Sequence, residues 1–194
     1  MNNSLCPHCS GSADLLLQTK DFNRRISNDS FNYFRCNICH FVFLNPVPVD
    51  LYRYYPPAYY DIPKTHKELS LRANKLQLWK INLVKLYAPG RGRLLEIGPA
   101  YGLFAFLAKE AGYDVTAIEM DSQCSKFLRE TVQINVVESP DTIRSLSKLP
   151  KFDVIVMWQV IEHLTDPWSL LSEACSHLNP GGILILDTPN PNAF

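Results

Sequence analysis

The fold is decided by the stretch Arg93-Leu94-Leu95-Glu96-Ile97-Gly98-Pro99-Ala100-Tyr101-Gly102. The apolar residues before Gly98 predict a buried strand, and residues 103–111 predict a helix. Glycines allow the backbone to turn sharply between the two, so that a ligand can approach the main chain beside a helix N-terminus. A second apolar run, 115–118, ends in Glu119, where a carboxylate can accept hydrogen bonds from both hydroxyls of a ribose. This order of elements is typical of a nucleoside-binding βαβ unit.

The spacing of the turn, Glu96-x-Gly98-x-Ala100-x-Gly102, differs from that of a dinucleotide-binding turn. A G-x-G-x-x-G turn contacts a pyrophosphate through its glycines. An acid inside the preceding strand would repel a pyrophosphate, but it would attract the ammonium of an amino-acid tail. The pattern resembles motif I of the class I S-adenosylmethionine-dependent methyltransferases. Ala100 stands in place of that family's usual middle glycine, and we expect this change to be mild.

Two further segments resemble the same family. Residues 152–167, FDVIVMWQVIEHLTDP, resemble its fourth strand and the following loop, and residues 179–186, NPGGILIL, resemble its next turn and fifth strand. The three landmarks occur in the family's order, and the resemblance covers roughly residues 91–194. It implies an α/β fold with a Rossmann-like, doubly wound and mainly parallel sheet, in agreement with the alternation of predicted strands and helices.

The resemblance also implies a binding site for S-adenosylmethionine, because ligands of open α/β sheets bind beyond the carboxyl ends of the strands. Glu96 would orient the amino-acid end of this cofactor, and Glu119 would hold its ribose. Met120 would cover the adenine, and the end of the fourth strand would lie near the sulfonium. The candidate cofactor-binding residues are Glu96, Gly98, Ala100, Gly102, Glu119, Met120, Trp158 and Gln159.

His163 is the candidate catalytic base, because it follows the fourth predicted strand and imidazole titrates near neutral pH. The alternative is that Glu162-His163-Leu164 fixes the loop, with His163 hydrogen-bonded to the backbone. The same tripeptide occurs in family members with differing acceptors, which favours this architectural role.

Four of the six cysteines form two C-x-x-C pairs, Cys6 with Cys9 and Cys36 with Cys39. Two such pairs can complete a tetrahedral metal site. We expect a structural Zn²⁺, because four thiolates leave no coordination position open for water or substrate. His8 and His40 are alternative ligands. A redox dithiol would instead need a C-x-x-C pair at the start of a helix, and neither pair has one.

The segment around these pairs predicts a small β-ribbon, built from an apolar run at 13–17 and an aromatic run at 31–34. Such a module has little core, so metal binding would supply most of its folding free energy. The remaining cysteines, Cys124 and Cys175, are expected to lie on helices as ordinary core residues.

We expect three parts along the chain: a zinc-binding module at 1–44, a linker or lid rich in proline and tyrosine at 45–63, and a methyltransferase domain at 64–194. The prolines exclude a regular helix from the middle part. Tyr59 and Tyr60 are candidate acceptor-binding residues, since tyrosine offers a stacking face and a hydroxyl. The alternative is that the tyrosines attach the zinc module to the catalytic domain. The succession of these parts resembles bacterial sugar and cell-surface glycan methyltransferases, which favours the lid.

Composition is that of a soluble enzyme: the 194 residues are 46% hydrophobic and the formal net charge is zero. No basic stripe is present, so we expect a small-molecule acceptor, such as a nucleotide-linked sugar, rather than nucleic acid. The N-terminus lacks a signal peptide and no apolar run approaches ~18 residues, so we expect no membrane span and a cytoplasmic location.

The secondary structure of the larger part follows from the hydrophobic pattern. Residues 64–87 predict one helix, with an apolar stripe of Leu69, Ala73, Leu76, Trp79, Leu83 and Leu86. The pattern then predicts strand 93–97, helix 102–111, strand 114–119, helix 122–131, strand 134–137, helix 140–147, strand 152–158, helix 167–178 and strand 183–187.

Two alternatives to an active methyltransferase remain at this point. One is a nicotinamide-dependent oxidoreductase. The other is a non-catalytic or inactive truncated protein, since the family normally adds a further helix and two strands after the fifth strand. The apolar run Ile183-Leu184-Ile185-Leu186 would then form an exposed sheet edge. We therefore expect a C-terminally truncated chain that self-associates through this edge and turns over poorly.

Overall fold

The computed structural model describes residues 3–22, 25–54, 60–90 and 92–190. The chain divides into two compact units, Met1–Tyr59 and Tyr60–Phe194, and this boundary lies within the predicted linker 45–63. The finer division into three parts stays a prediction. No helix within the described residues has the length and apolar character needed to cross a bilayer.

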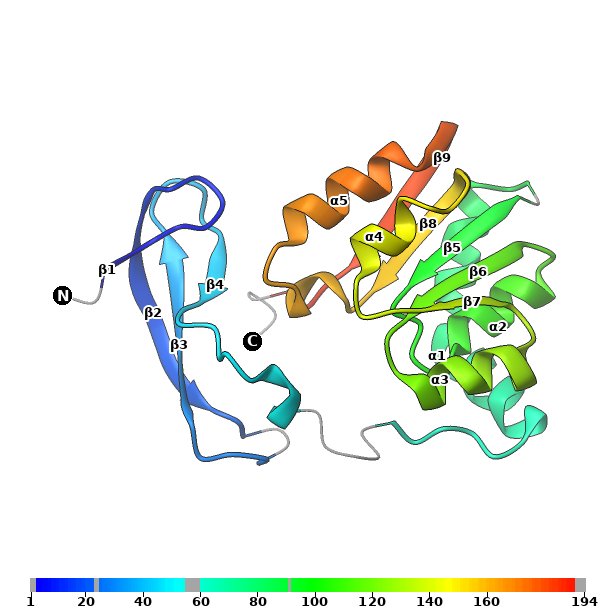
Figure 1. The fold of residues 1–194 in the computed structure, drawn as a ribbon, viewed down its shortest axis with the longest axis horizontal. Coiled ribbons are helices and arrows are strands. Elements are labelled where there is room, and N and C mark those ends of the chain that lie inside the picture. The colour runs from blue at the N-terminus through cyan, green and yellow to red at the C-terminus, as the bar shows by residue number, and fades with distance from the viewer. Residues whose placement is uncertain (1–2, 23–24, 55–59, 91, 191–194) are drawn as a thin grey trace. The chain divides into compact units, whose positions relative to one another are not determined.

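The first unit is an antiparallel sheet with the strand order β1-β2-β3-β4 (Figure 1). Its strands are β1 (Asn3–Leu5), β2 (Ser12–Lys20), β3 (Ser30–Cys36) and β4 (Val42–Leu44). The ribbon expected from the apolar and aromatic runs is confirmed by the β2–β3 pair. Among the described residues of this unit, the buried ones are Cys6, Gly11, Ala13, Phe34 and Cys36. This is a very small core, as predicted from the sequence.

A short 3₁₀ helix, Leu51–Tyr54, is attached to this sheet. The Tyr54 hydroxyl donates a hydrogen bond to Asp29 Oδ2 (2.7 Å), and Arg53 forms an ion pair with the same carboxylate (2.8 Å). The Tyr54 ring also meets that of Phe31 edge-on, with 5.6 Å between centroids. At least one tyrosine of the Pro/Tyr-rich segment therefore serves to attach that segment to the first unit.

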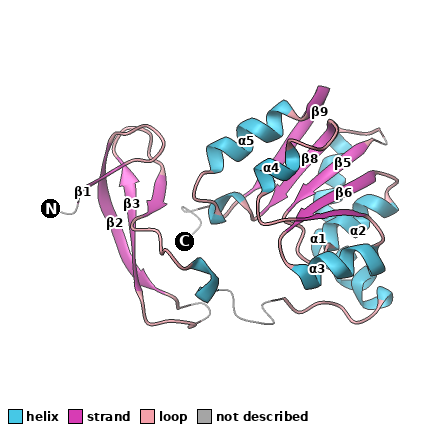
Figure 2. Cartoon of the chain, viewed as in Figure 1, coloured by secondary structure: helices cyan, strands magenta, loops and turns pink. Residues whose placement is uncertain are grey.

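The second unit contains a five-stranded parallel sheet with the order β7-β6-β5-β8-β9, which confirms the predicted fold class. Figure 1 labels these strands, and Figure 2 shows the sheet (magenta) with its helices (cyan). The strands are β5 (Arg93–Ile97), β6 (Asp114–Glu119), β7 (Asn135–Glu138), β8 (Phe152–Trp158) and β9 (Leu178–Asp187). The helices are α1 (His66–Tyr87), α2 (Leu103–Glu110), α3 (Ser122–Phe127), α4 (Thr142–Leu146) and α5 (Pro167–Ser176).

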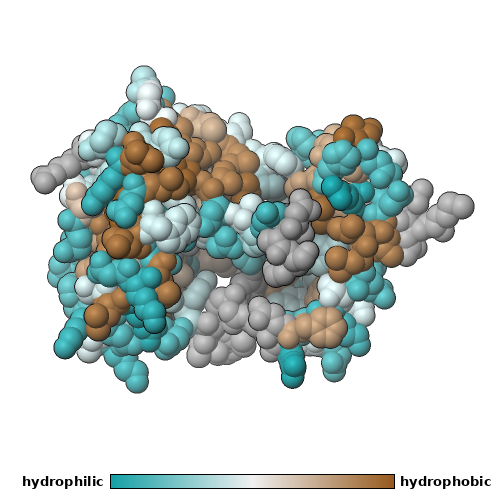
Figure 3. Space-filling model, turned by 180° about the vertical axis from the view of Figure 1, so that it is seen from behind, coloured by the Kyte–Doolittle hydropathy of each residue, from teal (hydrophilic) through white to brown (hydrophobic). Residues whose placement is uncertain are grey.

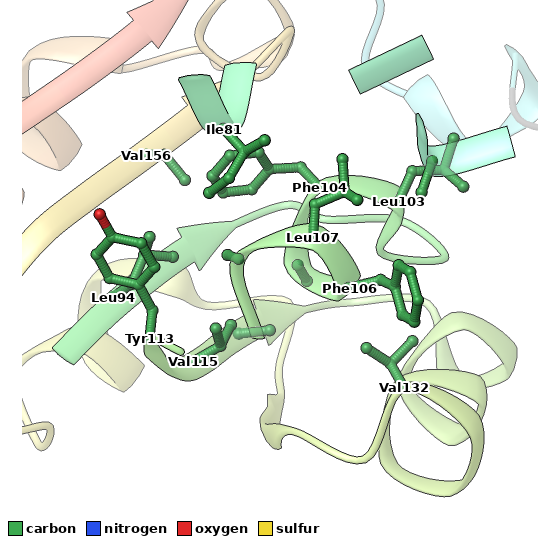
Figure 4. Close-up of a cluster of buried hydrophobic side chains, with 14 of the residues drawn as sticks. Ile81, Leu94, Leu103, Phe104, Phe106, Leu107, Tyr113, Val115, Val132 and Val156 are labelled. Carbon is green, nitrogen blue, oxygen red and sulfur yellow. The ribbon is translucent and has the colours of Figure 1, made fainter. Parts of the chain in front are cut away.

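The helices cover both faces of the sheet and enclose two hydrophobic cores. One core joins α1 and α2 to the face that carries Leu94 and Val156 (Figure 4). The other joins α4 and α5 to the opposite face, which carries Leu95 and Met157. Helix starts follow from local sequence: α3, α4 and α5 are each preceded by an aspartate that accepts a hydrogen bond from the backbone N–H three residues later.

The predicted apolar stripe of α1 is wrong in part. Leu76, Trp79 and Leu86 are 50%, 53% and 71% exposed. The buried residues are Leu69, Ala73, Lys80, Ile81 and Val84. Leucines occur around most of this helix, so the sequence is compatible with more than one orientation of α1 about its own axis. Packing against α2 selects the orientation in which Lys80 is buried. The exposed leucines of α1 contribute to the apolar surface. Figure 3 shows that, on one face of the molecule, apolar residues (brown) lie among polar ones (teal).

The bounds of other helices and strands also differ from the predicted ones. The helix predicted at 122–131 continues past α3 as a π-helical turn, Leu128–Val132. Strand β9 begins at Leu178 rather than 183, because Leu178 pairs with Phe152 before a register shift that brings Ile183 opposite Val154. Cys124 is buried as expected, whereas Cys175 is exposed on α5.

Candidate functional site

The turn between β5 and α2 adopts left-handed backbone conformations at alternate residues. The φ angles of Gly98, Ala100 and Gly102 are 68°, 52° and 76°. A Cβ atom at Gly98 would lie 2.8 Å from Val160 Cγ2, and one at Gly102 would collide with Leu128. Both positions therefore require glycine for space as well as for conformation.

Ala100 adopts a conformation that is unfavourable for a residue with a Cβ atom. The left-handed region costs an L-residue other than glycine roughly 1–2 kcal/mol. The replacement of the family's middle glycine is therefore less mild than expected from the sequence. The surrounding turn holds Ala100 in this conformation, and its backbone N–H is directed at Glu119.

Glu119 connects the end of β6 to the glycine turn. Its Oε2 accepts a hydrogen bond from Ala100 N (2.9 Å), and its Oε1 accepts one from Asp121 N (2.8 Å). The residue is buried, and burial raises the pKa of its carboxyl group. Each oxygen still has accepting capacity, because a carboxylate offers about four lone-pair sites. The group can therefore hold two ribose hydroxyls while it fixes the turn.

Glu96, near the end of β5, is fully enclosed. Its Oε2 is buried without a hydrogen-bond partner among the described residues. Burial raises the pKa of its carboxyl group to about 8, and the nearby Lys80 ammonium opposes that rise. A buried carboxyl oxygen without a partner is costly. An ammonium group, such as that of an amino-acid tail, would satisfy it, so this residue fits the predicted cofactor.

The residues at the end of β8 lie beside β5 but differ in their access to ligand. The Trp158 side chain is buried against Phe104 (5.1 Å between ring centroids), and within the described part of the chain its Nε1 has no hydrogen-bond partner. Gln159 has a φ of 56°, and both its backbone N and its Nε2 donate to Asp187 Oδ1 (3.0 and 2.7 Å). Met120, which follows Glu119, is 57% exposed. Sequence reasoning missed Asp187, whose carboxylate joins the ends of β8 and β9 through these hydrogen bonds.

The candidate acceptor and base residues are placed as follows. The Tyr60 ring meets the Tyr101 ring of the glycine turn edge-on, with 6.3 Å between centroids. Tyr59 lies outside the described residues. His163 is exposed at the end of a 3₁₀ turn, Ile161–His163, and its backbone N donates to Val160 O (3.0 Å). The catalytic assignment of His163 stays a prediction.

The four cysteines of the C-x-x-C pairs converge in the first unit. Their sulfur atoms all lie within 4.8 Å of one another, and the cluster found in the described part of the chain contains no histidine. The closest separations are 3.4 Å for Cys9–Cys36 and 3.5 Å for Cys9–Cys39. Sulfurs bound to one tetrahedral Zn²⁺ at about 2.3 Å lie at similar separations. The donor set therefore fits zinc.

Both C-x-x-C pairs form the same kind of turn. Ser10 N donates to Cys6 O, and His40 N donates to Cys36 O, with φ angles near 60° at Ser10 and His40. Backbone N–H groups also point at sulfur: the N–H of Cys39 and that of Ile38 lower the pKa of the Cys36 thiol to about 6. A thiolate is the form that binds a metal.

A hollow of about 400 Å³ lies at the amino ends of the parallel strands, at the other edge of the sheet from the glycine turn. Its lining includes Arg93 and Asn179, which both donate to the carboxylate of Asp153 (Arg93 N to Oδ2 and Asn179 Nδ2 to Oδ1, each 2.8 Å). These hydrogen bonds join the starts of β5 and β8 to the segment after α5. We interpret Asp153 as a structural residue that sequence reasoning missed.

Comparison with known proteins identifies the second unit. Residues 66–193 match the family model of a methyltransferase domain. The chain belongs to the S-adenosylmethionine-dependent methyltransferase family. S-adenosylmethionine is the co-substrate of this family, which decides against the nicotinamide-dependent alternative.

Individual methyltransferases show the extent of the similarity. The ubiquinone biosynthesis O-methyltransferase of Xanthomonas campestris pv. campestris (strain B100) is 31% identical over 113 residues, which cover 55% of this chain and 47% of that protein. The enzyme of the same name from Rickettsia canadensis (strain McKiel) is 29% identical over 102 residues, covering 50% and 42%. The crystal structure of an S-adenosylmethionine-dependent methyltransferase from Archaeoglobus fulgidus is 28% identical with a TM-score of 0.50, covering 62% of this chain and 58% of that one. The chain spans about half the length of the curated relatives it matches.

Proposed function

We propose that this chain binds S-adenosylmethionine across the carboxyl ends of β5 and β6 and directs its methyl group to a small polar acceptor. The observation that carries this proposal is the Glu119 carboxylate, which is buried, bonded to the backbone of the glycine turn and still able to accept hydrogen bonds. Glu96 gives a second support, because its Oε2, which has no partner among the described residues, can accept a hydrogen bond from the ammonium of the co-substrate. The co-substrate supplies an electrophilic sulfonium methyl group.

The protein contributes mainly alignment, since methyl transfer to a good nucleophile needs little else. The hydrogen bonds from Gln159 to Asp187 hold the ends of β8 and β9 in register beside β5. His163, on the loop after β8, accepts the acceptor's proton in this proposal when the nucleophile is a hydroxyl. Tyr60, against Tyr101, offers a ring and a hydroxyl to the acceptor.

A nucleotide-linked sugar is the acceptor that we propose to test first. The chain has zero formal net charge, which does not favour a nucleic acid, and tyrosine rings suit sugars and bases. The experiment is a screen of methyl transfer to nucleotide-linked sugars, tRNA and protein substrates. Turnover of nucleotide-linked sugars is the expected result, and turnover confined to a macromolecule would overturn the small-acceptor assignment.

We also propose that Cys6, Cys9, Cys36 and Cys39 bind one structural Zn²⁺. The support is the convergence of the four sulfurs and the N–H groups directed at Cys36. Because all four ligands come from the protein, this metal would stabilise the first unit and take no part in methyl transfer.

A non-catalytic role is the second candidate, and β9 is the observation that favours it. This strand pairs with β8 only, so among the described strands it forms one edge of the sheet. Its Leu186 is partly exposed, and an apolar edge favours pairing with another chain. Self-association through residues 183–186, together with cofactor binding but no turnover, would support this role. A monomer by light scattering at tens of micromolar with robust methyl transfer would exclude it.

A further inference from the structure

Lys80 is a buried lysine on the side of α1 that packs against the sheet. Its side chain is 10% exposed. The ammonium nitrogen lies 4.7 Å from the centroid of the Trp158 ring and 5.5 Å from that of Trp79. Burying a charge is costly unless another group compensates for the lost water. The position of Lys80 inside this interface therefore indicates a role.

The neighbouring strands β5, β8 and β9 place polar side chains on the face of the sheet that packs against α1. Trp158 ends β8 and lies opposite Asp187, which ends β9. Glu96 lies on β5 opposite Val156, which belongs to the same core as Trp158. Burial lowers the pKa of the Lys80 ammonium, and the carboxylates of Asp187 and Glu96 oppose this shift. The cluster thus holds one cation, two acids and one indole N–H at the carboxyl ends of the strands.

Among the described residues, Lys80 Nζ has no partner at hydrogen-bond distance. Its Nζ lies 3.9 Å from Asp187 Oδ2, which is longer than a hydrogen bond. The other oxygen of Asp187 already accepts two hydrogen bonds from Gln159. The carboxylate of Asp187 therefore binds mainly to Gln159, and it balances the buried charge of Lys80 only in part.

Two further polar atoms of the cluster are buried and have no hydrogen-bond partner among the residues that the structure describes. One is an acceptor, Glu96 Oε2, and the other is a donor, Trp158 Nε1. Buried polar groups in folded proteins are nearly always hydrogen-bonded. An unsatisfied acceptor and an unsatisfied donor beside an ammonium point to a ligand that carries both a cationic and an anionic group.

We propose that Lys80 binds the α-carboxylate of the amino-acid end of S-adenosylmethionine, with Trp158 Nε1 as a second donor, while Glu96 binds the α-ammonium. This inference rests on the proposed function and extends it to a residue of α1. The amino-acid end is a zwitterion, so it satisfies the unpartnered donor and the unpartnered acceptor together. The Trp158 ring, which faces the ammonium of Lys80, holds that side chain in place.

The test compares three ligands that share the adenosine and differ in the amino-acid end. S-adenosylhomocysteine carries the carboxylate and the ammonium, its decarboxylated analogue carries the ammonium alone, and 5′-methylthioadenosine carries neither. Calorimetry measures their affinities for the full chain and for Lys80→Met, Lys80→Arg and Glu96→Gln. Lys75→Met is the control, because Lys75 lies exposed on the same helix.

Lys80→Met is expected to weaken S-adenosylhomocysteine binding at least tenfold and to leave both other ligands unchanged. Lys80→Arg, which keeps the charge, should recover part of the loss. Glu96→Gln should weaken binding of the two ligands that carry an ammonium and spare 5′-methylthioadenosine. Unchanged affinity for 5′-methylthioadenosine shows in each case that the variant is folded.

The inference is overturned if Lys80→Met binds S-adenosylhomocysteine as the natural chain does, or loses all three ligands equally. It is also overturned if the natural chain binds 5′-methylthioadenosine as tightly as S-adenosylhomocysteine, a result that leaves the proposed function standing. Absence of binding of every ligand by the natural chain would instead reject the proposed function itself, and this inference with it.

Discussion

The backbone N–H of Ala100 donates a hydrogen bond of 2.9 Å to Oε2 of Glu119. This bond joins the turn after β5 to the end of β6, the two segments that form the proposed cofactor site. The residue that donates it has a left-handed conformation, with a φ of 52°. A strained backbone that is fixed by a buried carboxylate is typical of a functional site, where the surrounding structure holds what the residue itself disfavours.

Replacing Ala100 with glycine should relieve this strain. We expect Ala100→Gly to leave the free energy of unfolding unchanged or to raise it by up to about 1 kcal/mol, because the loss of strain outweighs or balances the greater freedom of the unfolded glycine. Ala108→Gly, within α2, should instead destabilise the protein by about 1 kcal/mol or more. Urea unfolding measures both, and equal destabilisation by the two variants would contradict the assignment of strain to Ala100.

The zinc proposal predicts about one Zn²⁺ per chain by elemental analysis of protein purified without chelator. Cys36→Ser should abolish stoichiometric zinc and unfold the first unit, because that unit has little core of its own. Cys175→Ser is the matched control, since Cys175 is exposed on α5. Metal-free protein with a folded first unit would show that the cluster is not a zinc site.

The buried carboxyl group of Glu96 predicts a pH dependence of stability. Its pKa is about 8 in the folded protein and near 4.5 when exposed. Between these values the folded state binds the additional proton, so the contribution of Glu96 to stability falls as the pH rises. Glu96→Gln removes this term.

We therefore expect the stability of Glu96→Gln, relative to the natural chain, to increase from pH 5 to pH 8.5 by on the order of 1–3 kcal/mol. Urea unfolding at several pH values measures the difference. Glu110→Gln, on the exposed end of α2, should show no such trend. A difference independent of pH would mean that Glu96 is ionised throughout.

Asp153 should matter for folding and not for ligand binding. Asp153→Ala removes the acceptor for Arg93 N and Asn179 Nδ2, so we expect a loss of about 1–3 kcal/mol in the free energy of unfolding. The affinity of the folded variant for S-adenosylhomocysteine should stay unchanged, because Asp153 lies at the opposite ends of the strands. A selective loss of affinity without destabilisation would reverse this interpretation.

The parts of the fold that follow from local pattern were predictable. Strands β5, β6 and β8 begin and end at the predicted residues, because each is an apolar run bounded by polar or turn-forming residues. The rotation of α1 was not predictable, since leucines surround this helix and only contact with α2 decides which of them are buried. The apolar stripe predicted for this helix did not include Lys80, so sequence reasoning missed the cluster around that residue.

The residues of the candidate site also fall into those that could be predicted from the sequence and those that could not. The glycine turn and the two acids, Glu96 and Glu119, could be predicted because their spacing is fixed by the βαβ unit. Asp187 could not, because its role depends on the register between β8 and β9, which brings it opposite Trp158 and next to Gln159. Contacts between strands that are distant in sequence leave no periodic signal in either strand.

The most direct test of the account is calorimetry of S-adenosylhomocysteine with the natural chain, Glu119→Gln and Glu119→Ala, with Glu110→Ala as control and NAD as a second ligand. We expect the natural chain and the control to bind S-adenosylhomocysteine and not NAD. Glu119→Ala should bind it roughly ten- to a hundred-fold more weakly, as for the loss of hydrogen bonds to a charged group, and Glu119→Gln should lie between. Unchanged affinity in Glu119→Ala, or binding of NAD in place of S-adenosylhomocysteine, would contradict the proposed site.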